Sequence, residues 1–179
     1  MDDLGIRFLV ATDVHLGHQE KHPIRSGDSY EGFQEVIDQA KSNNVDFLLL
    51  GGDLFDEVNP SKECFFRCLN MLKENVFGNK QVNLNVTLNG DKYRSNFENE
   101  DVNISLPIFT IHGNHDYPTN DFGKISACDL LQASNYVNYF GKYPNLHEIV
   151  IRPLIITKAG SSSKIALYGL GYIKDLILN

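Results

Sequence analysis

The chain has 179 residues, of which 42% are hydrophobic and 22% are charged. This is enough apolar material for one domain, and the chain is too short for two. It has 11 Phe, 8 Tyr and no apolar run of about 20 residues, so disordered and membrane-spanning proteins are excluded. The net charge of −7 argues against nucleic-acid binding unless carboxylates that hold cations reverse the charge locally.

The acidic N-terminus, Met1–Asp3, leads into an apolar run, so we expect neither a secretory signal nor a transit peptide. The cysteines, Cys64, Cys68 and Cys128, are odd in number and lack CxxC spacing. This favours reduced thiols over a disulfide framework or a zinc site. Both features are typical of a cytosolic or nuclear protein.

Strand and helix patterns alternate in the first 110 residues. Apolar runs at Ile6–Ala11, Phe47–Leu50 and Ile108–Ile111 predict buried strands. Between the first two, apolar residues at i, i+3, i+4 and i+7 predict a helix over Asp28–Asn44. A strand, a helix and a strand in this order indicate parallel strands with a right-handed crossover.

The ends of the predicted helices carry capping signals. Asp28 and Glu31 have the spacing of a capping box at the start of the first helix. A second helix is expected over Pro60–Phe77, with Pro60 in the first helical position after an Asn59 cap. This helix places the third strand in the same sheet.

The pattern changes after the second helix. Residues Asn79–Ser105 are rich in polar side chains, with one weak alternating stretch at Val82–Leu88, and predict an exposed insertion. After residue 120 we expect one short helix and three strands: Ile125–Ala133, then His147–Ile151, Leu154–Thr157 and Lys164–Gly169.

Each of the three strong strands is followed by residues that can bind a metal. These are Asp13 and His15, then Asp53, then Asn114 and His115. Each loop taken alone is more typical of a turn or a helix cap. Ligands of open parallel sheets bind beyond the carboxyl ends of the strands, so we expect the three loops to meet in one metal site.

Oxygen and imidazole ligands without thiolates favour Mn, Fe or Zn over a structural cysteine site. Asp53 is the expected bridge between two ions, because Gly113 and the glycines before Asp53 let the backbone approach closely. Two divalent ions about 4 Å apart would hold a phosphate and lower the pKa of a bound water.

The residues around these loops have simpler interpretations. His112 precedes the glycine of its loop and is expected to be a hydrogen-bonded core histidine. His18 and His22 are expected to be solvated loop residues or weak phosphate contacts. Asp116 has the chemistry to hydrogen-bond His115 and fix its tautomer, or to close a local turn.

The motifs DxH, GD and GNHD in this order resemble the calcineurin-like metallophosphoesterases, an α/β fold with a β-sandwich flanked by helices. Longer stretches are similar to the eukaryotic double-strand-break-repair nucleases of the MRN complex: Ile6–Gly17, Val45–Ser61, Leu106–Thr119 and Lys164–Gly171. The resemblance covers nearly all of residues 6 to about 173.

For the site, the resemblance implies two Mn²⁺ ions and a catalytic pair. The implied ligands are Asp13, His15 and Asp53 for one ion and Asp53 and Asn114 for the other, with His115 and Asp116 as catalytic residues. The implied activity is a manganese-dependent DNA nuclease of the nucleus, a 3'-to-5' exonuclease and single-strand endonuclease in double-strand break repair and meiosis.

The implied partners are DNA, a coiled-coil ABC-type ATPase subunit, nibrin and a second copy of the chain, with no membrane. Dimerisation in the family uses helices like the second and third predicted here. The interface candidates, which are equally typical of ordinary core, are Phe65, Phe66, Leu69, Leu72, Ile125 and Leu131.

Two departures from the family pattern affect the expected activity. Asp56 stands where the family usually has His, and a carboxylate can hydrogen-bond water or reach a metal but cannot donate as imidazole does. The family's remaining ligands, a lone His and a His-x-His, have no match here, since His147 is the one histidine after His115. We therefore expect residues 1–179 to be the N-terminal portion of a nuclease domain, C-terminally incomplete and of little activity alone.

Two other functions remain open. A protein or small-molecule phosphoesterase has the same fold, but the protein phosphatases follow GD with Asp-Arg-Gly and end in GNHE, where this chain reads GDLFDEV and GNHD. The second is a non-catalytic fragment that dimerises, or binds nibrin through the Asn-rich segment.

Overall fold

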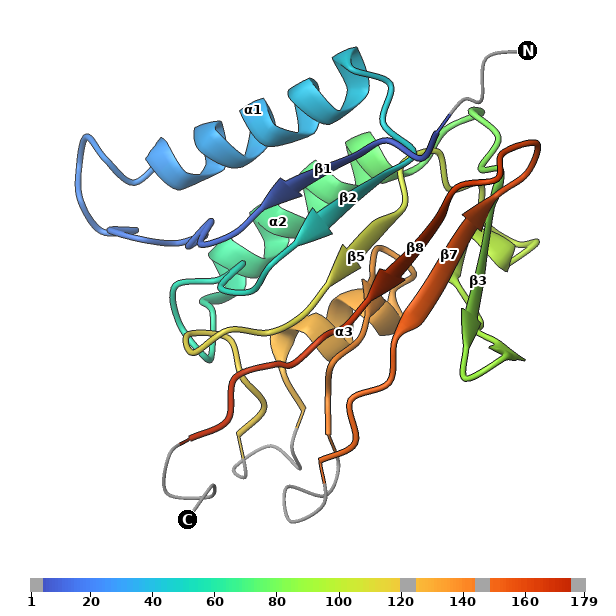
Figure 1. Cartoon of the computed structure of the whole chain (residues 1–179). Helices are drawn as coiled ribbons and strands as arrows, with labels where there is room; N and C mark the ends of the chain where they lie inside the picture. The colour runs from blue at the N-terminus through green and yellow to red at the C-terminus, as the bar shows by residue number, and fades with distance from the viewer. Residues whose placement is uncertain (1–4, 120–124, 144–148, 175–179) are drawn as a thin grey trace.

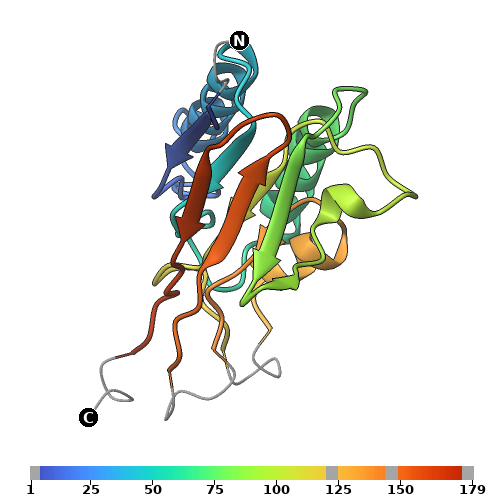
Figure 2. The ribbon, with the colours of Figure 1, turned by 45° about the vertical axis from the view of Figure 1, so that its right-hand side comes forward.

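The computed structural model describes residues 5–119, 125–143 and 149–174. In these residues two four-stranded sheets pack face to face, and three helices cover the outer side of one of them (Figure 1). The view turned by 45° shows the layers in the order helices, first sheet, second sheet (Figure 2). The expected α/β sandwich flanked by helices is confirmed. None of the helices found in the described residues has the length and apolar character to cross a membrane.

The first sheet is parallel and has the order β1-β2-β5-β6. Its strands are β1 (Phe8–Ala11), β2 (Phe47–Leu50), β5 (Ile108–Thr110) and β6 (Asn138–Tyr139). The three predicted strands are confirmed, but the burial expected of the first is wrong, because β1 is an edge strand in which Phe8 and Val10 are exposed. The short β6 was not predicted, because two residues are too few to show a period.

The three helices are α1 (Asp28–Ser42), α2 (Lys62–Val76) and α3 (Ala127–Ala133). The predicted caps of α1 and α2 are wrong. Gly27 precedes α1 without a side-chain cap, and Ser61, rather than Asn59, caps α2 by accepting from the Cys64 backbone N–H. Both caps were misplaced because residue spacing predicts the first residue of a helix only to within one or two positions.

The second sheet is antiparallel and has the order β4-β3-β7-β8. Its strands are β3 (Leu84–Leu88), β4 (Asp91–Lys92), β7 (Leu154–Lys158) and β8 (Lys164–Leu167), and the short 3₁₀ helix η1 (Asn96–Glu98) follows β4. The strands predicted around β7 and β8 are confirmed. The strand predicted at His147–Ile151 begins outside the described residues, and residues 149–151 form no strand.

The exposure expected for Asn79–Ser105 is wrong for part of the segment, although many of its residues are exposed. This segment supplies β3, an inner strand of the second sheet, and the side chains of Leu84 and Val86 are buried. They pack between the sheets with Phe47 and Phe109, whose side chains point away from the helices. The weak alternation at this segment was therefore a real strand signal, because one face of an inner strand must be apolar.

The two faces of the parallel sheet are divided by alternation along its strands. On β2, Phe47 packs against the second sheet while Leu48 and Leu50 pack under the helices. The same alternation separates Phe109 from Ile108 on β5. Burial on both faces makes β2 and β5 a firm base for the loops that leave their carboxyl ends, whereas β1 is an edge strand with Phe8 and Val10 exposed.

Candidate metal centre

The loops after β1 and β2 run side by side beyond the sheet. The backbone N–H of His15 donates to the Asp53 carbonyl at 3.0 Å, and that of Leu16 donates to Leu54 at 2.8 Å. In the return direction the Asp56 N–H donates to the Leu16 carbonyl at 3.1 Å. These bonds extend the β1–β2 pairing and bring the DVH and GDLFD motifs together.

The loop after β5 is attached to the β2 loop by two carboxylates. Asp53 Oδ1 accepts from the His115 backbone N–H at 2.7 Å. Asp116 Oδ1 accepts from the Gly113 N–H at 2.7 Å, while its Oδ2 accepts from the Leu54 N–H at 2.9 Å. A Cβ at Gly113 would overlap the Asp53 carboxylate, so glycine is required for this approach.

The loops after β1 and β2 bring together a cluster of the kind that binds metal. One ligand atom each from Asp13, His15 and Asp53 lies within 4.8 Å of the others. His15 Nε2 is 3.8 Å from Asp13 Oδ1, and the Asp13 side chain is 62% exposed, so the cluster is open to solvent. The structure thus brings Asp13, His15 and Asp53 together, and their assignment as metal ligands stays a prediction.

All three cluster residues have left-handed backbone. The φ angles are +56° at Asp13, +51° at His15 and +50° at Asp53. Asp adopts this region more readily than most residues, but it remains costly for any residue with a Cβ. Strain of this kind is concentrated at functional sites, where the fold holds side chains in fixed directions.

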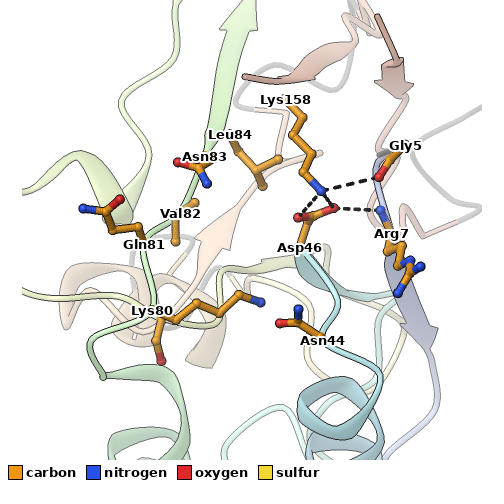
Figure 3. Close-up of a pocket in the computed structure, with 11 residues that line it drawn as sticks. Gly5, Arg7, Asn44, Asp46, Lys80, Gln81, Val82, Asn83, Leu84 and Lys158 are labelled. Atoms are coloured by element: carbon orange, nitrogen blue, oxygen red, sulfur yellow. Dashed lines mark hydrogen bonds and ion pairs between the residues drawn. The ribbon is translucent and has the colours of Figure 1, made fainter. Parts of the chain in front are cut away.

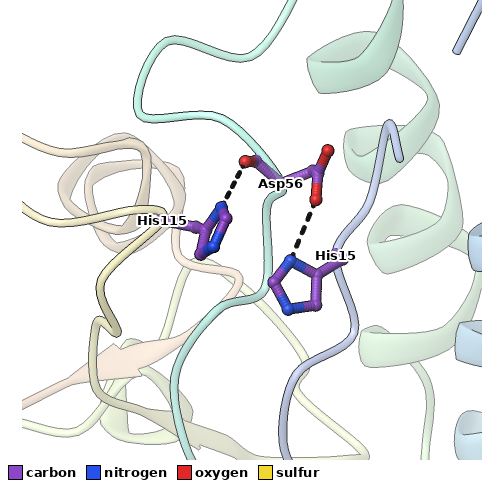
Figure 4. Close-up of side chains that lie close together, drawn as sticks. All are labelled: His15, Asp56 and His115. Atoms are coloured by element: carbon purple, nitrogen blue, oxygen red, sulfur yellow. Dashed lines mark hydrogen bonds and ion pairs between the residues drawn. The ribbon is translucent and has the colours of Figure 1, made fainter. Parts of the chain in front are cut away.

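Asp56 lies at the centre of a second group, in which one ligand atom each from His15, Asp56 and His115 lies within 4.8 Å of the others (Figure 4). Asp56 Oδ1 is 3.0 Å from His15 Nδ1. This contact is an ion pair without hydrogen-bond geometry, and His15 Nδ1 is a buried polar atom without a hydrogen bond. The backbone oxygen of Asp56 accepts from His115 Nδ1 at 2.7 Å.

Asp56 also affects the protonation of His115. The hydrogen bond to the Asp56 carbonyl raises the pKa of His115, and the nearby carboxylates of Asp53, Asp56 and Glu57 act in the same direction, while desolvation opposes them. His115 therefore keeps its proton to a higher pH than an isolated imidazole. Its ring meets the His15 ring edge-on, with centroids 4.7 Å apart.

The donor set fits a divalent metal ion. Two carboxylates and an imidazole are ligands that Mn, Fe and Zn take in proteins. His15 presents Nε2 to Asp13 while Nδ1 faces Asp56, as in metal-binding histidines that a carboxylate holds from behind. Asn114 is exposed and directly precedes His115, and its assignment as a metal ligand stays a prediction.

The structure corrects the expected contact of Asp116. No hydrogen bond joins Asp116 to His115, although both are in the described part of the chain. The Asp116 carboxylate is fully buried and binds backbone N–H groups of two loops. Burial raises the pKa of Asp116. Asp116 thus fixes the backbone that presents the site, and its assignment as a catalytic residue stays a prediction.

The structure gives the contacts of two histidines outside the cluster, His112 and His18. His112 is buried, with its Nδ1 at 2.6 Å from the Tyr139 hydroxyl and its Nε2 at 3.2 Å from the Tyr172 carbonyl, which confirms a hydrogen-bonded core histidine. His18 lies 3.2 Å from the Asp56 carboxylate. The motif spacing did not reveal that contact, because it joins residues 38 positions apart.

The interface candidates divide into core and surface. Leu72 and Leu131 are 0% exposed and belong to the core, so their assignment to a dimer interface is wrong. Phe66 and Ile125 are 62% and 50% exposed. With the half-buried Phe65 and Leu69 they line an apolar groove of about 570 Å³ between α2 and α3.

These observations define a class of protein. The model of the calcineurin-like phosphoesterase family matches residues 6–176. Since the match covers nearly the whole chain, the chain belongs to this family of metal-dependent phosphoesterases.

More specific relatives are double-strand break repair proteins. The chain is 42% identical over 184 residues to MRE11 of rice (Oryza sativa subsp. indica), which covers 97% of the chain and 26% of the relative. It is 40% identical over 181 residues to human MRE11, covering 97% and 25%, and 40% identical over 176 residues to mus-23 of Neurospora crassa, covering 95% and 23%. The chain thus spans about a quarter of the length of these relatives, and the resemblance seen in the motifs is confirmed.

Proposed function

We propose that this chain carries the metal-binding loops of a DNA phosphodiesterase that acts in double-strand break repair. The observation that carries the proposal is the meeting of Asp13, His15 and Asp53 at the carboxyl ends of adjacent parallel strands. Its relatives are named for double-strand break repair, and a DNA strand is a phosphodiester substrate suited to such a site.

In this proposal Asp13, His15 and Asp53 hold one Mn²⁺ ion, and Asp53 and Asn114 contribute to a second. Such ions polarise a phosphoryl oxygen and lower the pKa of bound water. Asp53 is fixed by a hydrogen bond from the His115 N–H, whereas His15 has an ion-pair contact with the Asp56 carboxylate. The fixed directions reduce the reorganisation needed when substrate binds.

His115 is proposed to hold the proton that a leaving oxygen needs. Its Nδ1 is occupied by the Asp56 carbonyl, which leaves Nε2 free to face substrate. Its raised pKa suits a proton donor near neutral pH. Asp116 contributes by holding the backbone of the GNHD loop against the β2 loop.

We propose the 3'-to-5' exonuclease and single-strand endonuclease activities implied by the resemblance, in the nucleus, with a coiled-coil ATPase subunit and nibrin as partners. Within the described residues the second ion has fewer side-chain ligands than the first. A site with few ligands binds metal weakly. Cleavage by the isolated chain is therefore proposed to be slow, and metal binding is the primary measurement.

The test compares Asp53→Asn with Asp38→Asn, a matched change on the exposed side of α1. Titration calorimetry with Mn²⁺ should show binding by the unaltered chain and by Asp38→Asn, and at least a tenfold loss for Asp53→Asn. Cleavage of a DNA hairpin beside hydrolysis of a phosphopeptide separates a nuclease from a phosphatase. Equal Mn²⁺ affinity in all three chains, or preference for the phosphopeptide, would contradict the proposal.

A second function, dimerisation, is favoured by the exposed apolar groove at α2 and α3. We propose that a second copy of the chain covers it. Light scattering should show a dimer that Phe66→Asp separates into monomers, because Phe66 is exposed and its replacement leaves the core intact. Monomers in the unaltered chain, or a persistent Phe66→Asp dimer, would contradict this assignment.

A further inference from the structure

A second imidazole reaches the centre through the Asp56 carboxylate. His18 follows Gly17, whose φ of +89° turns the loop, and the His18 backbone N–H donates to the His15 carbonyl at 3.0 Å. This turn places His18 Nδ1 at 3.2 Å from both carboxylate oxygens of Asp56. One carboxylate is thus shared between His15 and His18.

The shared contact fixes which side of the His18 ring meets solvent. Because Nδ1 faces Asp56, Nε2 lies on the opposite side of the ring, and the side chain is 55% exposed. The Asp56 side chain is only 20% exposed and is held by the backbone bond to Leu16. His18 is therefore a solvent-accessible side chain that contacts a largely buried carboxylate beside the candidate metal centre.

His22 provides an internal comparison in the same loop. Its Nδ1 accepts from the backbone N–H groups of Ile24 at 3.2 Å and Arg25 at 3.1 Å. It therefore stabilises a local turn, and within the described part of the chain no hydrogen bond or ion pair joins it to Asp56. Of these two loop histidines, His18 is the one directed to the metal centre.

The negative charge of the carboxylates at the candidate metal centre explains how His18 would help to bind a polyanion. Asp13, Asp53 and Asp56 are three carboxylates that repel a polyanionic strand unless cations offset them. A protonated His18 donates from Nδ1 to Asp56 and keeps a second N–H, on Nε2, for an anionic acceptor. A charged donor of this kind forms short, strong hydrogen bonds to phosphate oxygens.

We propose that His18, positioned by Asp56, binds a backbone phosphate of the substrate strand next to the phosphate held at the metal centre. The inference rests on the proposed phosphodiesterase function and adds a substrate-binding residue to it. Asp56 acts as a positioning residue, because it contacts His18 and His15 rather than the phosphate.

The test is DNA binding in Ca²⁺, by anisotropy of a fluorescein-labelled oligothymidylate at a single mildly acidic pH. We expect His18→Ala to raise Kd about tenfold, the loss of one charged hydrogen bond. The slope of log K against log salt should fall by about 0.7, the loss of one contact to a single strand. His22→Ala should change neither quantity, and circular dichroism checks that all chains are folded.

The role of Asp56 is tested by a double-mutant cycle. In an Asp56→Asn background the loss caused by His18→Ala should shrink to about twofold, because residues in contact are not additive. A full tenfold loss in that background would overturn the positioning role of Asp56.

The outcomes separate the inference from the proposed function. If the unaltered chain binds the oligonucleotide and His18→Ala binds equally well, the phosphate-binding role is overturned and the proposed function stands. If His22→Ala weakens binding as much as His18→Ala, the effect belongs to the loop, and the role is again overturned. If the unaltered chain binds no DNA, both proposals fall.

Discussion

The carboxylates at the two ends of the parallel sheet differ in their partners. At the amino ends a cavity of about 580 Å³ contains Asp46, which accepts from Lys158 Nζ at 2.9 Å and from the Arg7 backbone N–H at 2.8 Å (Figure 3). Lys80 Nζ donates to the Val45 carbonyl at 2.8 Å, and burial lowers its pKa. The Asp46 carboxylate at this end is therefore paired with a cation of the protein itself.

At the carboxyl ends the carboxylates have no such cation. Within the described residues no lysine or arginine forms an ion pair with Asp13, Asp53 or Asp56. Their partners are imidazoles, a backbone N–H group and the Thr12 hydroxyl, which donates to Asp13. A carboxylate paired with lysine stabilises the fold, whereas carboxylates gathered around imidazoles are available to a cation. The partners of the carboxylates therefore locate the candidate metal centre better than the size of a cavity does.

The largest expected effect comes from closing the space at the metal end. Gly113→Ala places a Cβ where the Asp53 carboxylate lies. We expect Mn²⁺ binding to be lost and the free energy of unfolding to fall by about 3 kcal/mol, measured by calorimetry and urea denaturation.

Gly32→Ala is the control for this change, because a Cβ there has no neighbour within 4 Å and the residue lies inside α1. It should raise the free energy of unfolding by about 0.5–1 kcal/mol and leave Mn²⁺ binding unchanged. Normal Mn²⁺ affinity in Gly113→Ala would show that the Asp53 position is not essential to the site.

A smaller effect is expected at the amino end. Lys158→Met leaves the mostly buried Asp46 carboxylate without its cation. Urea denaturation should show a loss of about 1–2 kcal/mol in the free energy of unfolding, with unchanged Mn²⁺ affinity. Lys164→Met, at an exposed position of β8, should be neutral within about 0.5 kcal/mol. A fall in Mn²⁺ affinity in Lys158→Met would mean that the two ends are coupled.

The smallest effect concerns the pH dependence of stability, through His112, which directly precedes the GNHD motif. Burial lowers the pKa of His112 below its ordinary value of 6.5. Between that lowered pKa and about 6.5 the unfolded chain binds more protons than the folded one, so stability falls as pH falls through this window. Urea denaturation from neutral to acidic pH should show a steeper loss for the unaltered chain than for His112→Gln. Parallel curves would show that His112 accepts a proton without cost to the fold.

Periodicity predicted the elements that carry the site. The apolar runs of β1, β2 and β5 were long enough to be recognised, and their order required a parallel sheet. That is why the meeting of Asp13, His15 and Asp53 followed from sequence spacing. The same patterns did not separate core from surface on the helices, where Leu72 proved to be buried and Phe66 exposed.

The sequence by itself determined which loops carry the candidate ligands, because strand order and alternation are local properties of the chain. Only the tertiary structure decided which atoms those ligands and their neighbours contact. The Asp116 carboxylate holds a backbone N–H 62 positions away, and the Asp56 carboxylate holds His18 across 38. Contacts at such separations depend on how two loops pack in space, which no local pattern of side chains specifies.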